Sequence, residues 1–328
     1  MDRLIINGRT PLKGEVCISG SKNAVLPIMA ATIITPGEYR LKNVPKLRDT
    51  ITMKRLLEII GAIVKYKDNV MYINTSGCNS PVAPYDLVKT MRASFYVLGP
   101  LLSRFNHAEV SLPGGCAWGP RPVNYHIQAI EALGAKINLT EGMVVAKGKL
   151  CGAEITFEQK SVGATGNTIM AAVKSTGTTI INNAAQEPEI EALCKFLEKM
   201  GANIKGVGSD KIIIHGKKEL RANIEYSIIP DRIEAGTFLI AGAITSGNVK
   251  VANVIPSHLT ILIDNLIKAG FQLDISKDTI QIQTQNKPLK PVDMVTATYP
   301  GFPTDLQAQW MALMTKADGS STITDAIY

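Results

Sequence analysis

The sequence lacks any long uninterrupted hydrophobic run. The longest apolar stretch, from Ala24 to Ile34, contains a proline and is too short to cross a lipid bilayer. The N-terminal residues Met1 to Leu4 also lack the basic and then apolar order of a secretory signal peptide. We therefore expect a soluble, cytoplasmic protein without a membrane partner.

Cysteine and histidine are scarce, and neither occurs in a metal-binding pattern. The five cysteines are odd in number, widely separated and free of any C-x-x-C pair. This argues against a disulfide framework and against a cysteine zinc site. The four histidines are isolated and form no H-x-x-x-H pair. We expect no metal ion and no other cofactor.

The sequence also lacks a dense block of lysine and arginine, although its net charge is +7. A nucleic-acid-binding protein usually carries its basic residues in such a block or in a stripe interleaved with aromatic residues. A moderately basic chain is equally suited to a small polyanionic substrate. Charge alone does not choose between these partners.

What the sequence does contain is a repeated pattern. A glycine after an apolar, helix-like run is followed six residues later by Asn or Asp, at Gly37/Asn43, Gly177/Asn183, Gly247/Asn253 and Gly319/Asp325. These glycines are separated by 140, 70 and 72 residues, so one unit spans about 70 residues and the longest gap holds two units. A chain of 328 residues with 45% hydrophobic residues can divide such units between two domains.

Each unit reads as a helix, a strand, a second helix closed by glycine, and two further strands. Units of this length predict compact, pseudo-symmetric α/β domains and not a solenoid. Four units are complete, and the fifth ends at Tyr328 just after its strand. We therefore expect a chain that is cut short within its second domain, since half a unit exposes a strand edge.

The segment from Pro113 to Pro122 holds three glycines and three prolines in ten residues. Proline and glycine exclude a helix interior or a central strand, so the segment is predicted to be a surface loop. Its thiol, Cys116, lies five residues before Arg121, and a nearby cation favours the reactive thiolate. Cys116 is thus a candidate reactive residue, although the loop alone is equally compatible with a cysteine of no function.

The Pro113–Pro122 segment and five others closely resemble the UDP-N-acetylglucosamine 1-carboxyvinyltransferase family, the enolpyruvyl transferases of early peptidoglycan synthesis. The other five segments are Gly20–Asn23, Val88–Ser94, Ser161–Thr165, Pro230–Glu234 and Phe302–Asp305. The resemblance extends from Met1 to Tyr328. It implies an inside-out α/β barrel built from βαβαββ repeats and divided into two domains.

The implied domains have crossed connectivity. Residues 22–229 would form the first domain with three repeats, and residues 1–21 plus 230–328 would form the second, incomplete one. A strand pair between Leu4 and Ser19 would then complete the sheet of the second domain.

The resemblance also implies the reaction. The family moves the enolpyruvyl group of phosphoenolpyruvate to the 3-hydroxyl of UDP-N-acetylglucosamine and releases phosphate, without nucleic acid or membrane. The chemistry needs an acid that protonates the methylene carbon, a base for the hydroxyl, and cations for the carboxylate and phosphates.

The two catalytic residues that the resemblance implies are Cys116 and Asp305. Cys116 would be the general acid, would form an adduct with phosphoenolpyruvate, and would be the residue that fosfomycin attacks. Arg121 would hold the substrate phosphate and move with Cys116 as a lid closes. Asp305 would act on the sugar 3-hydroxyl as base or orienter.

The remaining implied residues bind substrate. Lys22 and Asn23 would contact phosphoenolpyruvate at the start of the first helix, where N–H groups attract anions. Arg92 would hold a phosphate at the corresponding place in the second repeat, and Ile327 would contact the sugar through its backbone. The clamp for uridine and diphosphate would consist of Arg121, Pro122, Val123, Asn124, Tyr125, Ser161, Val162 and Gly163.

Each of these residues has an ordinary alternative. Lys22 could be a solvated helix-start charge, Arg92 a surface ion pair, Arg121 a solvated loop cation, and Asp305 the N-cap of a helix. Three positions depart from the family pattern. Asn124 replaces an aspartate, Tyr96 replaces a tryptophan as packing, and Gln159 replaces a lysine for which Lys160 could compensate.

Two alternative functions stay open. The first is transfer to shikimate 3-phosphate on the same fold, against which the cysteine loop and the nucleotide clamp argue. The second is a truncated chain that binds the nucleotide sugar without turnover. An asparagine–arginine pair and a further arginine, both expected beyond Tyr328, are absent from the sequence.

Overall fold

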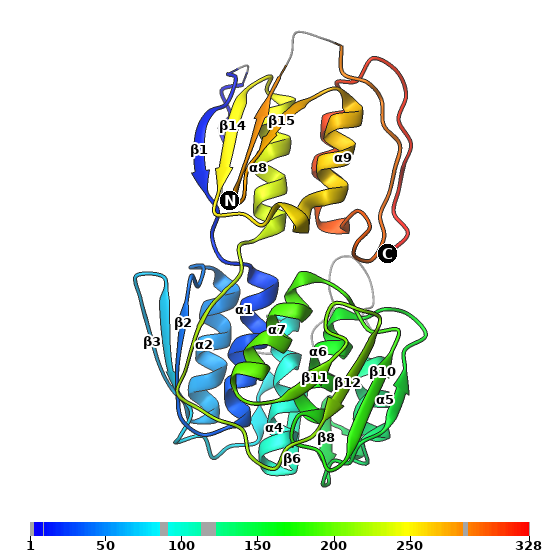
Figure 1. The fold of residues 1–328 in the computed structure, drawn as a ribbon. Helices are drawn as coiled ribbons and strands as arrows, with labels where there is room; N and C mark the ends of the chain where they lie inside the picture. Colours follow the sequence, from blue (N-terminus) through cyan, green and yellow to red (C-terminus); the bar gives the residue numbers. More distant parts are fainter. Residues whose placement is uncertain (1–2, 9, 86–90, 113–122, 285–287, 328) are drawn as a thin grey trace. The chain divides into compact units, whose positions relative to one another are not determined.

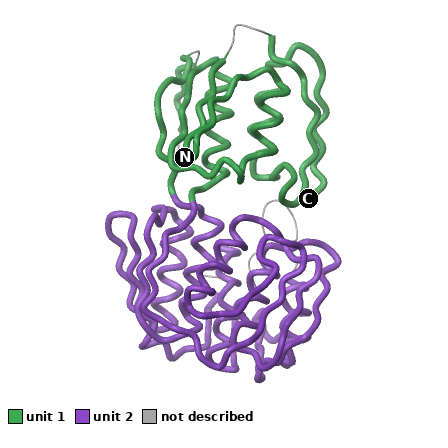
Figure 2. Tube along the Cα trace, in the orientation of Figure 1, with its two compact units in different colours: residues 1–19, 230–328 green, residues 20–229 purple. Residues whose placement is uncertain are grey.

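The computed structural model describes residues 3–8, 10–85, 91–112, 123–284 and 288–327. The chain divides into two compact units, which Figure 2 shows in different colours. We call residues 1–19 with 230–328 unit 1 and residues 20–229 unit 2. Within the described ranges, no helix is long and apolar enough to cross a membrane.

Unit 2 contains three copies of one arrangement of helices and strands (Figure 1). The first copy comprises α1 (Lys22–Ala31), η1 (Thr32–Ile34), β2 (Glu38–Lys42), α2 (Arg48–Ile60), β3 (Ile63–Lys67) and β4 (Val70–Asn74). The second comprises β5 (Val82–Ala83), η2 (Arg92–Val97), α4 (Leu98–Phe105), β6 (His107–Ser111), α5 (Asn124–Ala132), β7 (Lys136–Thr140) and β8 (Met143–Lys147). The third comprises β9 (Glu154–Thr156), α6 (Val162–Ala172), β10 (Thr178–Asn182), α7 (Pro188–Lys199), β11 (Asn203–Lys205) and β12 (Lys211–His215).

Each copy has a four-stranded sheet with the same strand order. The orders are β5-β6-β8-β7, β9-β10-β12-β11 and, for the first copy, β13-β2-β4-β3, in which β13 spans Ile224–Ser227. The first two strands of each sheet are parallel and the remaining neighbours are antiparallel. A parallel pair requires a crossover connection, and in the second and third copies a buried helix supplies it.

Helices α1, α4 and α6 lie inside unit 2, whereas α2, α5 and α7 each keep an exposed side (Figure 1). Residues 24–31 of α1 and 164–172 of α6 are all buried, as expected for helices that are hydrophobic on every side. The strands instead bury alternate residues, so each sheet covers the helices with one face and presents the other to solvent. The inside-out α/β arrangement predicted from the sequence is confirmed.

Two strands are exchanged between the sequence repeats. Strand β13 comes from the end of unit 2, yet it pairs with β2 of the first copy. Strand β1 (Lys13–Cys17) directly precedes α1 in the sequence, yet it pairs with β14 (Asn248–Ala252) of unit 1. Leu4 to Ile6 are exposed and belong to no strand, so the strand pair expected between Leu4 and Ser19 is wrong in its first half.

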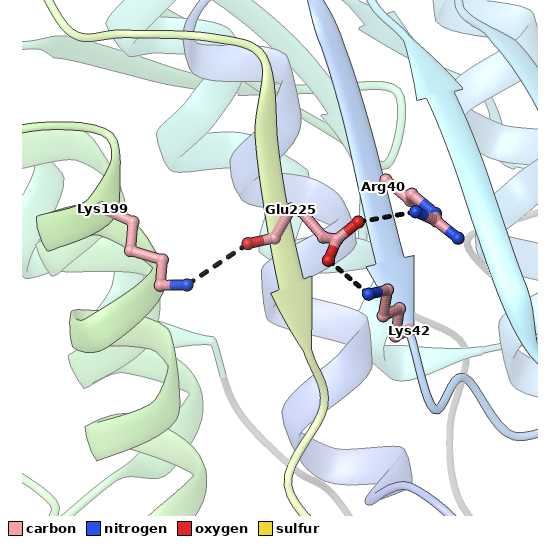
Figure 3. A network of polar contacts seen from close by, with 4 residues as sticks. All are labelled: Arg40, Lys42, Lys199 and Glu225. Atoms are coloured by element: carbon pink, nitrogen blue, oxygen red, sulfur yellow. Dashed lines mark hydrogen bonds and ion pairs between the residues drawn. The ribbon is translucent and has the colours of Figure 1, made fainter.

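A cluster of charges lies on the outer face where β13 meets β2 (Figure 3). The carboxylate of Glu225 accepts hydrogen bonds from Lys42 and, at 2.7 Å, from Arg40. Lys199 of α7 donates to the Glu225 carbonyl at 3.3 Å. The hydrogen bond from Lys42, followed by the charges of Lys42 and Arg40, lowers the pKa of Glu225. Exposed pairs of this kind add little stability, but they favour this strand neighbour.

Unit 1 contains one complete copy of the same arrangement and the first elements of another copy. The complete copy comprises α8 (Arg232–Ile244), β14, η3 (Pro256–Leu259), α9 (Thr260–Ala269), β15 (Gln272–Ile275) and β16 (Thr279–Gln283), with sheet order β1-β14-β16-β15. The next elements are β17 (Met294–Val295), η4 (Thr304–Leu306), α10 (Gln307–Met314) and β18 (Ile323–Thr324). Strands β17 and β18 pair in parallel, as the first two strands of the other copies do.

The recurring asparagine of the sequence pattern has a structural cause. Asn43, Asn183 and Asn253 lie one residue after β2, β10 and β14 and adopt a left-handed backbone, with φ of 56°, 53° and 56°. Asparagine tolerates this conformation better than other non-glycine residues. In each copy the side-chain amide donates to the first carbonyl after the parallel neighbour strand. These bonds are Asn43 to Ile228 (3.0 Å), Asn183 to Phe157 (2.9 Å) and Asn253 to Ile18 (2.7 Å).

Candidate functional site

The buried helices of unit 2 begin at one end of that unit. Helices α4 and α6 run parallel. Asn167 of α6 lies beside Phe95 and Gly99, and Ala171, one turn further along α6, lies beside Gly99, so the two chains advance in the same direction. Helix α4 also runs parallel to α1, since η2, which precedes α4, packs on α1, whereas α4 itself packs on η1 at the end of α1. The N-terminal ends of helices offer unpaired N–H groups and a partial positive charge. This end of unit 2 is therefore suited to anions.

Two of these helices begin with the same cap. The hydroxyl of Ser21 accepts from the N–H of Ala24 at 3.3 Å, and that of Ser161 accepts from the N–H of Ala164 at 3.3 Å. The sequence predicts anion contacts at both starts, in Lys22–Asn23 and in Ser161–Gly163. The structure confirms only that these residues open helices, and their contacts with substrate stay predictions.

Lys22 and Asn23 form the first turn of α1. The Lys22 side chain is exposed, and its ammonium lies 3.9 Å from a carboxylate oxygen of Asp49. A pair this long and this exposed contributes little to stability. Asn23 is half-buried. The ammonium thus stands at a helix start, where N–H groups attract anions.

Arg92 opens η2 and is half-buried. Its charge acts on two neighbours, because it contributes to the shifted pKa values of His126 and Tyr96. Burial is the main cause of the raised pKa of Tyr96. The Tyr96 ring packs so closely on α6 that a Cβ on residue 166 would lie 3.0 Å from it, which fits the packing role expected for this position.

Helix α5 carries the next group of candidates. Val123 is buried and precedes the helix, Asn124 is its exposed first residue, and Tyr125 is half-buried. The Tyr125 ring meets the edge of the Phe157 ring at a centroid distance of 6.0 Å. The start of α5 is thereby fixed against the third copy, in which Ser161 to Gly163 lie.

A buried polar network joins these elements, and no motif spacing in the sequence predicts it. Nδ1 of His126 lies 3.0 Å from the side-chain amide nitrogen of Asn167. The same nitrogen of Asn167 donates to the Phe95 carbonyl at 2.9 Å, and its oxygen accepts from the Gly99 N–H at 2.7 Å. The edge of one ring faces the other in the pair Phe95 and His126. Burial and, next, the Arg92 charge lower the pKa of His126 from 6.5 to about 3.

The network brings together three of the predicted groups, namely Arg92, Val123–Tyr125 and Ser161–Gly163. A signal for it was present, because His126 directly follows Tyr125 in the sequence. The histidines were dismissed for their lack of a metal-binding spacing. That criterion finds metal ligands and does not detect a histidine that takes part in a buried hydrogen-bond network.

Lys160 was expected to compensate for Gln159 near a diphosphate. Its ammonium instead donates to the carbonyl of Ala184 at 3.3 Å and to the side chain of Gln186 at 3.0 Å. These bonds direct Lys160 toward the loop between β10 and α7. The structure therefore gives no support to the compensation.

The candidates of unit 1 lie near η4 and at the end of β18. Asp305 is exposed and lies within η4, where Pro303 occupies the N-cap position, so Asp305 is not the helix cap that was its alternative. The Ile327 N–H donates to the Asp325 carboxylate at 2.9 Å, so a backbone contact with a ligand would fall to its carbonyl. A pocket of about 180 Å³ lies beside η4 and is lined by residues that include Arg232, Tyr299, Pro303 and Leu306.

Three predicted residues, Cys116, Arg121 and Pro122, lie outside the described residues. No group of three or more His, Cys, Asp or Glu side chains that could hold a metal ion occurs in the part of the chain that the structure describes. The described candidates therefore consist of helix starts, cations, one exposed carboxylate and the His126 network.

Comparison with known proteins identifies the family to which the chain belongs. A family model described as EPSP synthase (3-phosphoshikimate 1-carboxyvinyltransferase) matches residues 6–328. The chain is 51% identical to the UDP-N-acetylglucosamine 1-carboxyvinyltransferase of Chlorobium luteolum and 52% identical to that of Chlorobaculum parvum. Both alignments include 100% of this chain and 78% of the relative. The chain belongs to the UDP-N-acetylglucosamine 1-carboxyvinyltransferase family.

Solved structures support the fold of this family member. The enolpyruvyl transferase NikO from Streptomyces tendae matches with a TM-score of 0.88 at 24% identity, over 98% of this chain and 77% of NikO. An EPSP synthase from Acinetobacter baumannii matches with a TM-score of 0.73 at 18% identity, over 97% of this chain and 75% of that protein. At these identities the matches establish the enolpyruvyl transferase fold alone.

Proposed function

We propose that the protein transfers the enolpyruvyl group of phosphoenolpyruvate to the 3-hydroxyl of UDP-N-acetylglucosamine and releases phosphate. The observation that carries this proposal is an identity of 51% to 52%, over the whole chain, to relatives that bear this activity as their name. We further propose that it acts in the cytoplasm and in peptidoglycan synthesis, with these two molecules as its substrates and without a cofactor.

The reaction has two stages. In the first, the sugar hydroxyl oxygen bonds to C2 of phosphoenolpyruvate, the hydroxyl proton passes to a base, and the methylene carbon gains a proton. In the second, that carbon loses a proton and phosphate leaves C2, which restores the double bond. We assign the acid to Cys116 and the base to Asp305, since the thiol and the carboxylate suit these two proton transfers.

The cations and helix starts of unit 2 have the chemistry that the anionic substrates require. Lys22 and Arg92 each stand in the first turn of a helical segment at the end where N–H groups are unpaired. We assign phosphoenolpyruvate to Lys22, Asn23, Arg92 and Arg121. We assign the nucleotide sugar to Pro122–Tyr125, Ser161–Gly163, Asp305 and Ile327, with the diphosphate at the α6 N-terminus.

Transfer to shikimate 3-phosphate is the second candidate, because the matching family model carries that activity in its description. Phosphate release from phosphoenolpyruvate, assayed with each acceptor in turn, separates the two. We expect release with UDP-N-acetylglucosamine and none above background with shikimate 3-phosphate. Release with shikimate 3-phosphate alone would contradict the proposal, and binding of UDP-N-acetylglucosamine without release would favour a binding protein.

Fosfomycin should alkylate Cys116 before any other thiol, and UDP-N-acetylglucosamine should accelerate the labelling. Cys78 and Cys194 are buried, and burial raises the pKa of the Cys194 thiol to about 12, so it is not a thiolate at neutral pH. Cys17 and Cys151 are exposed and serve as internal controls. Peptide mass spectrometry after short exposure measures the order.

A general alkylating reagent such as iodoacetamide should reach Cys17 and Cys151 as well, and the nucleotide sugar should not accelerate those two reactions. If fosfomycin labelled Cys17 or Cys151 as fast as Cys116, the assignment of Cys116 as the reactive thiol would be wrong.

A further inference from the structure

The imidazole of His126 lies at the N-terminal turn of α6. A Cβ on residue 163 would lie only 3.0 Å from Nε2 of His126, so glycine at this position admits the edge of the ring. The His126 residue is 7% exposed. Within the described residues, no group hydrogen-bonds to Nε2. A ring nitrogen without a partner among these residues is available to a ligand or to water.

The network around His126 fixes which nitrogen carries the proton. The Asn167 amide cannot be reversed, because its oxygen must accept from the Gly99 N–H and its nitrogen must donate to the Phe95 carbonyl. The same NH2 group therefore presents a proton to Nδ1 of His126 at 3.0 Å. Nδ1 must accept this hydrogen bond and therefore carries no proton of its own. The single proton of the neutral ring consequently resides on Nε2.

We propose that Nε2–H of His126 donates a hydrogen bond to a phosphate oxygen of the nucleotide-sugar diphosphate at the α6 N-terminus. This inference rests on the proposed function, because it assigns a further binding residue to the same site. His126 and the Ser161–Gly163 turn act on one anion from two elements. The ring is held by Asn167 from one side, so the donor is oriented before the ligand arrives.

The environment keeps this donor neutral. Burial and the neighbouring Arg92 charge disfavour a proton on Nδ1 over the whole physiological pH range. Arg92 carries a positive charge in this region, whereas the neutral imidazole of His126 contributes an oriented hydrogen-bond donor without a second charge. The donor is consequently independent of pH where the protein works.

Two substitutions at one position test the proposal. His126→Phe and His126→Gln both remove the Nδ1 acceptor, but only Gln retains a nitrogen donor near the position of Nε2. Calorimetry with UDP-N-acetylglucosamine should show binding about 10- to 100-fold weaker for His126→Phe, as expected for a hydrogen bond to a charged group. His126→Gln should stay within about threefold of the wild type. His215→Phe, at a histidine on the outer strand β12, is the control for the change itself.

Nitrogen-15 NMR of the histidine side chains supplies a second readout. The His126 ring should show a proton on Nε2, and pyrophosphate or UDP-N-acetylglucosamine should shift this resonance. A shift with pyrophosphate but no binding of the nucleotide sugar would support a phosphate-binding role for His126 and contradict the proposed function. Binding of the nucleotide sugar without a shift would overturn the inference alone. Equal losses in His126→Phe and His126→Gln, or no loss in either, would also overturn it.

Discussion

Cys116→Ser should lower the rate of phosphate release by about two to four powers of ten, the range typical for the loss of a general acid. A serine hydroxyl is a far weaker acid than a thiol, so it delivers a proton to the methylene carbon poorly near neutral pH. Affinity for UDP-N-acetylglucosamine should stay close to that of the wild type, because the proposed clamp does not include the thiol. Phosphate release and calorimetry measure the two quantities.

Cys17→Ser is the matched control for this substitution. Cys17 is an exposed thiol of β1, so the same change of one atom should alter neither rate nor affinity. If Cys116→Ser retained the wild-type rate, another group would have to be the acid. If Cys116→Ser lost affinity and rate together, Cys116 would act in substrate binding. Its assignment to catalysis alone would then be wrong.

Local patterns predicted the elements of this fold well. The glycines that close second helices were read correctly, because Gly61 and Gly270 end α2 and α9 with φ of 109° and 104°. Only glycine adopts this conformation without strain, so the signal depends on one residue and not on tertiary contacts. The repeat spacing likewise predicted three equivalent copies in unit 2.

Contacts between distant residues could not be read in the same way. His126 and Asn167 are 41 positions apart, and neither lies in a sequence pattern that predicts a buried hydrogen-bond network. Asn167 is surrounded in the sequence by the small and apolar residues of α6, so a pattern of hydrophobicity assigns it to the core. Its role appears only when α4, α5 and α6 are packed together. The Leu4–Ser19 error has a similar origin, since Leu4 to Ile6 have strand-like composition but no partner strand among the described residues.

Two residues of the motif Pro230–Glu234 hold the local chain in place. The Asp231 carboxylate accepts from the N–H groups of Ile233 and Glu234 at 2.8 and 3.1 Å, as an N-cap does. The Glu234 carboxylate accepts from the N–H of Ser19 at 3.0 Å and from its hydroxyl. These residues fix the start of α8 and the chain where β1 ends. We therefore assign structural roles to Asp231 and Glu234.

Asn167→Leu should destabilise unit 2 by about 3–5 kcal/mol, the second large effect that we expect. The substitution removes the partner of two buried groups, the Gly99 N–H and Nδ1 of His126. The Phe95 carbonyl retains the Leu98 N–H. The Gly99 N–H lies at the start of α4, and the side-chain oxygen of Asn167 accepts its hydrogen bond at 2.7 Å. Each unsatisfied buried group costs about 1–3 kcal/mol, and part of this cost is relieved by relaxation.

Thr168→Val is the matched control, because Thr168 is equally buried in the next position of α6 but bonds only to the Ala164 carbonyl of its own helix. We expect it to cost less than about 1 kcal/mol, since a helix carbonyl already has its backbone partner. Hydrogen exchange of the α4 and α6 amides, together with urea unfolding, measures the loss in unit 2 separately from unit 1. Equal losses for Asn167→Leu and Thr168→Val would mean that the network does not stabilise these helices. A large loss confined to Asn167→Leu would mean that the groups which orient His126 also hold the helix starts together.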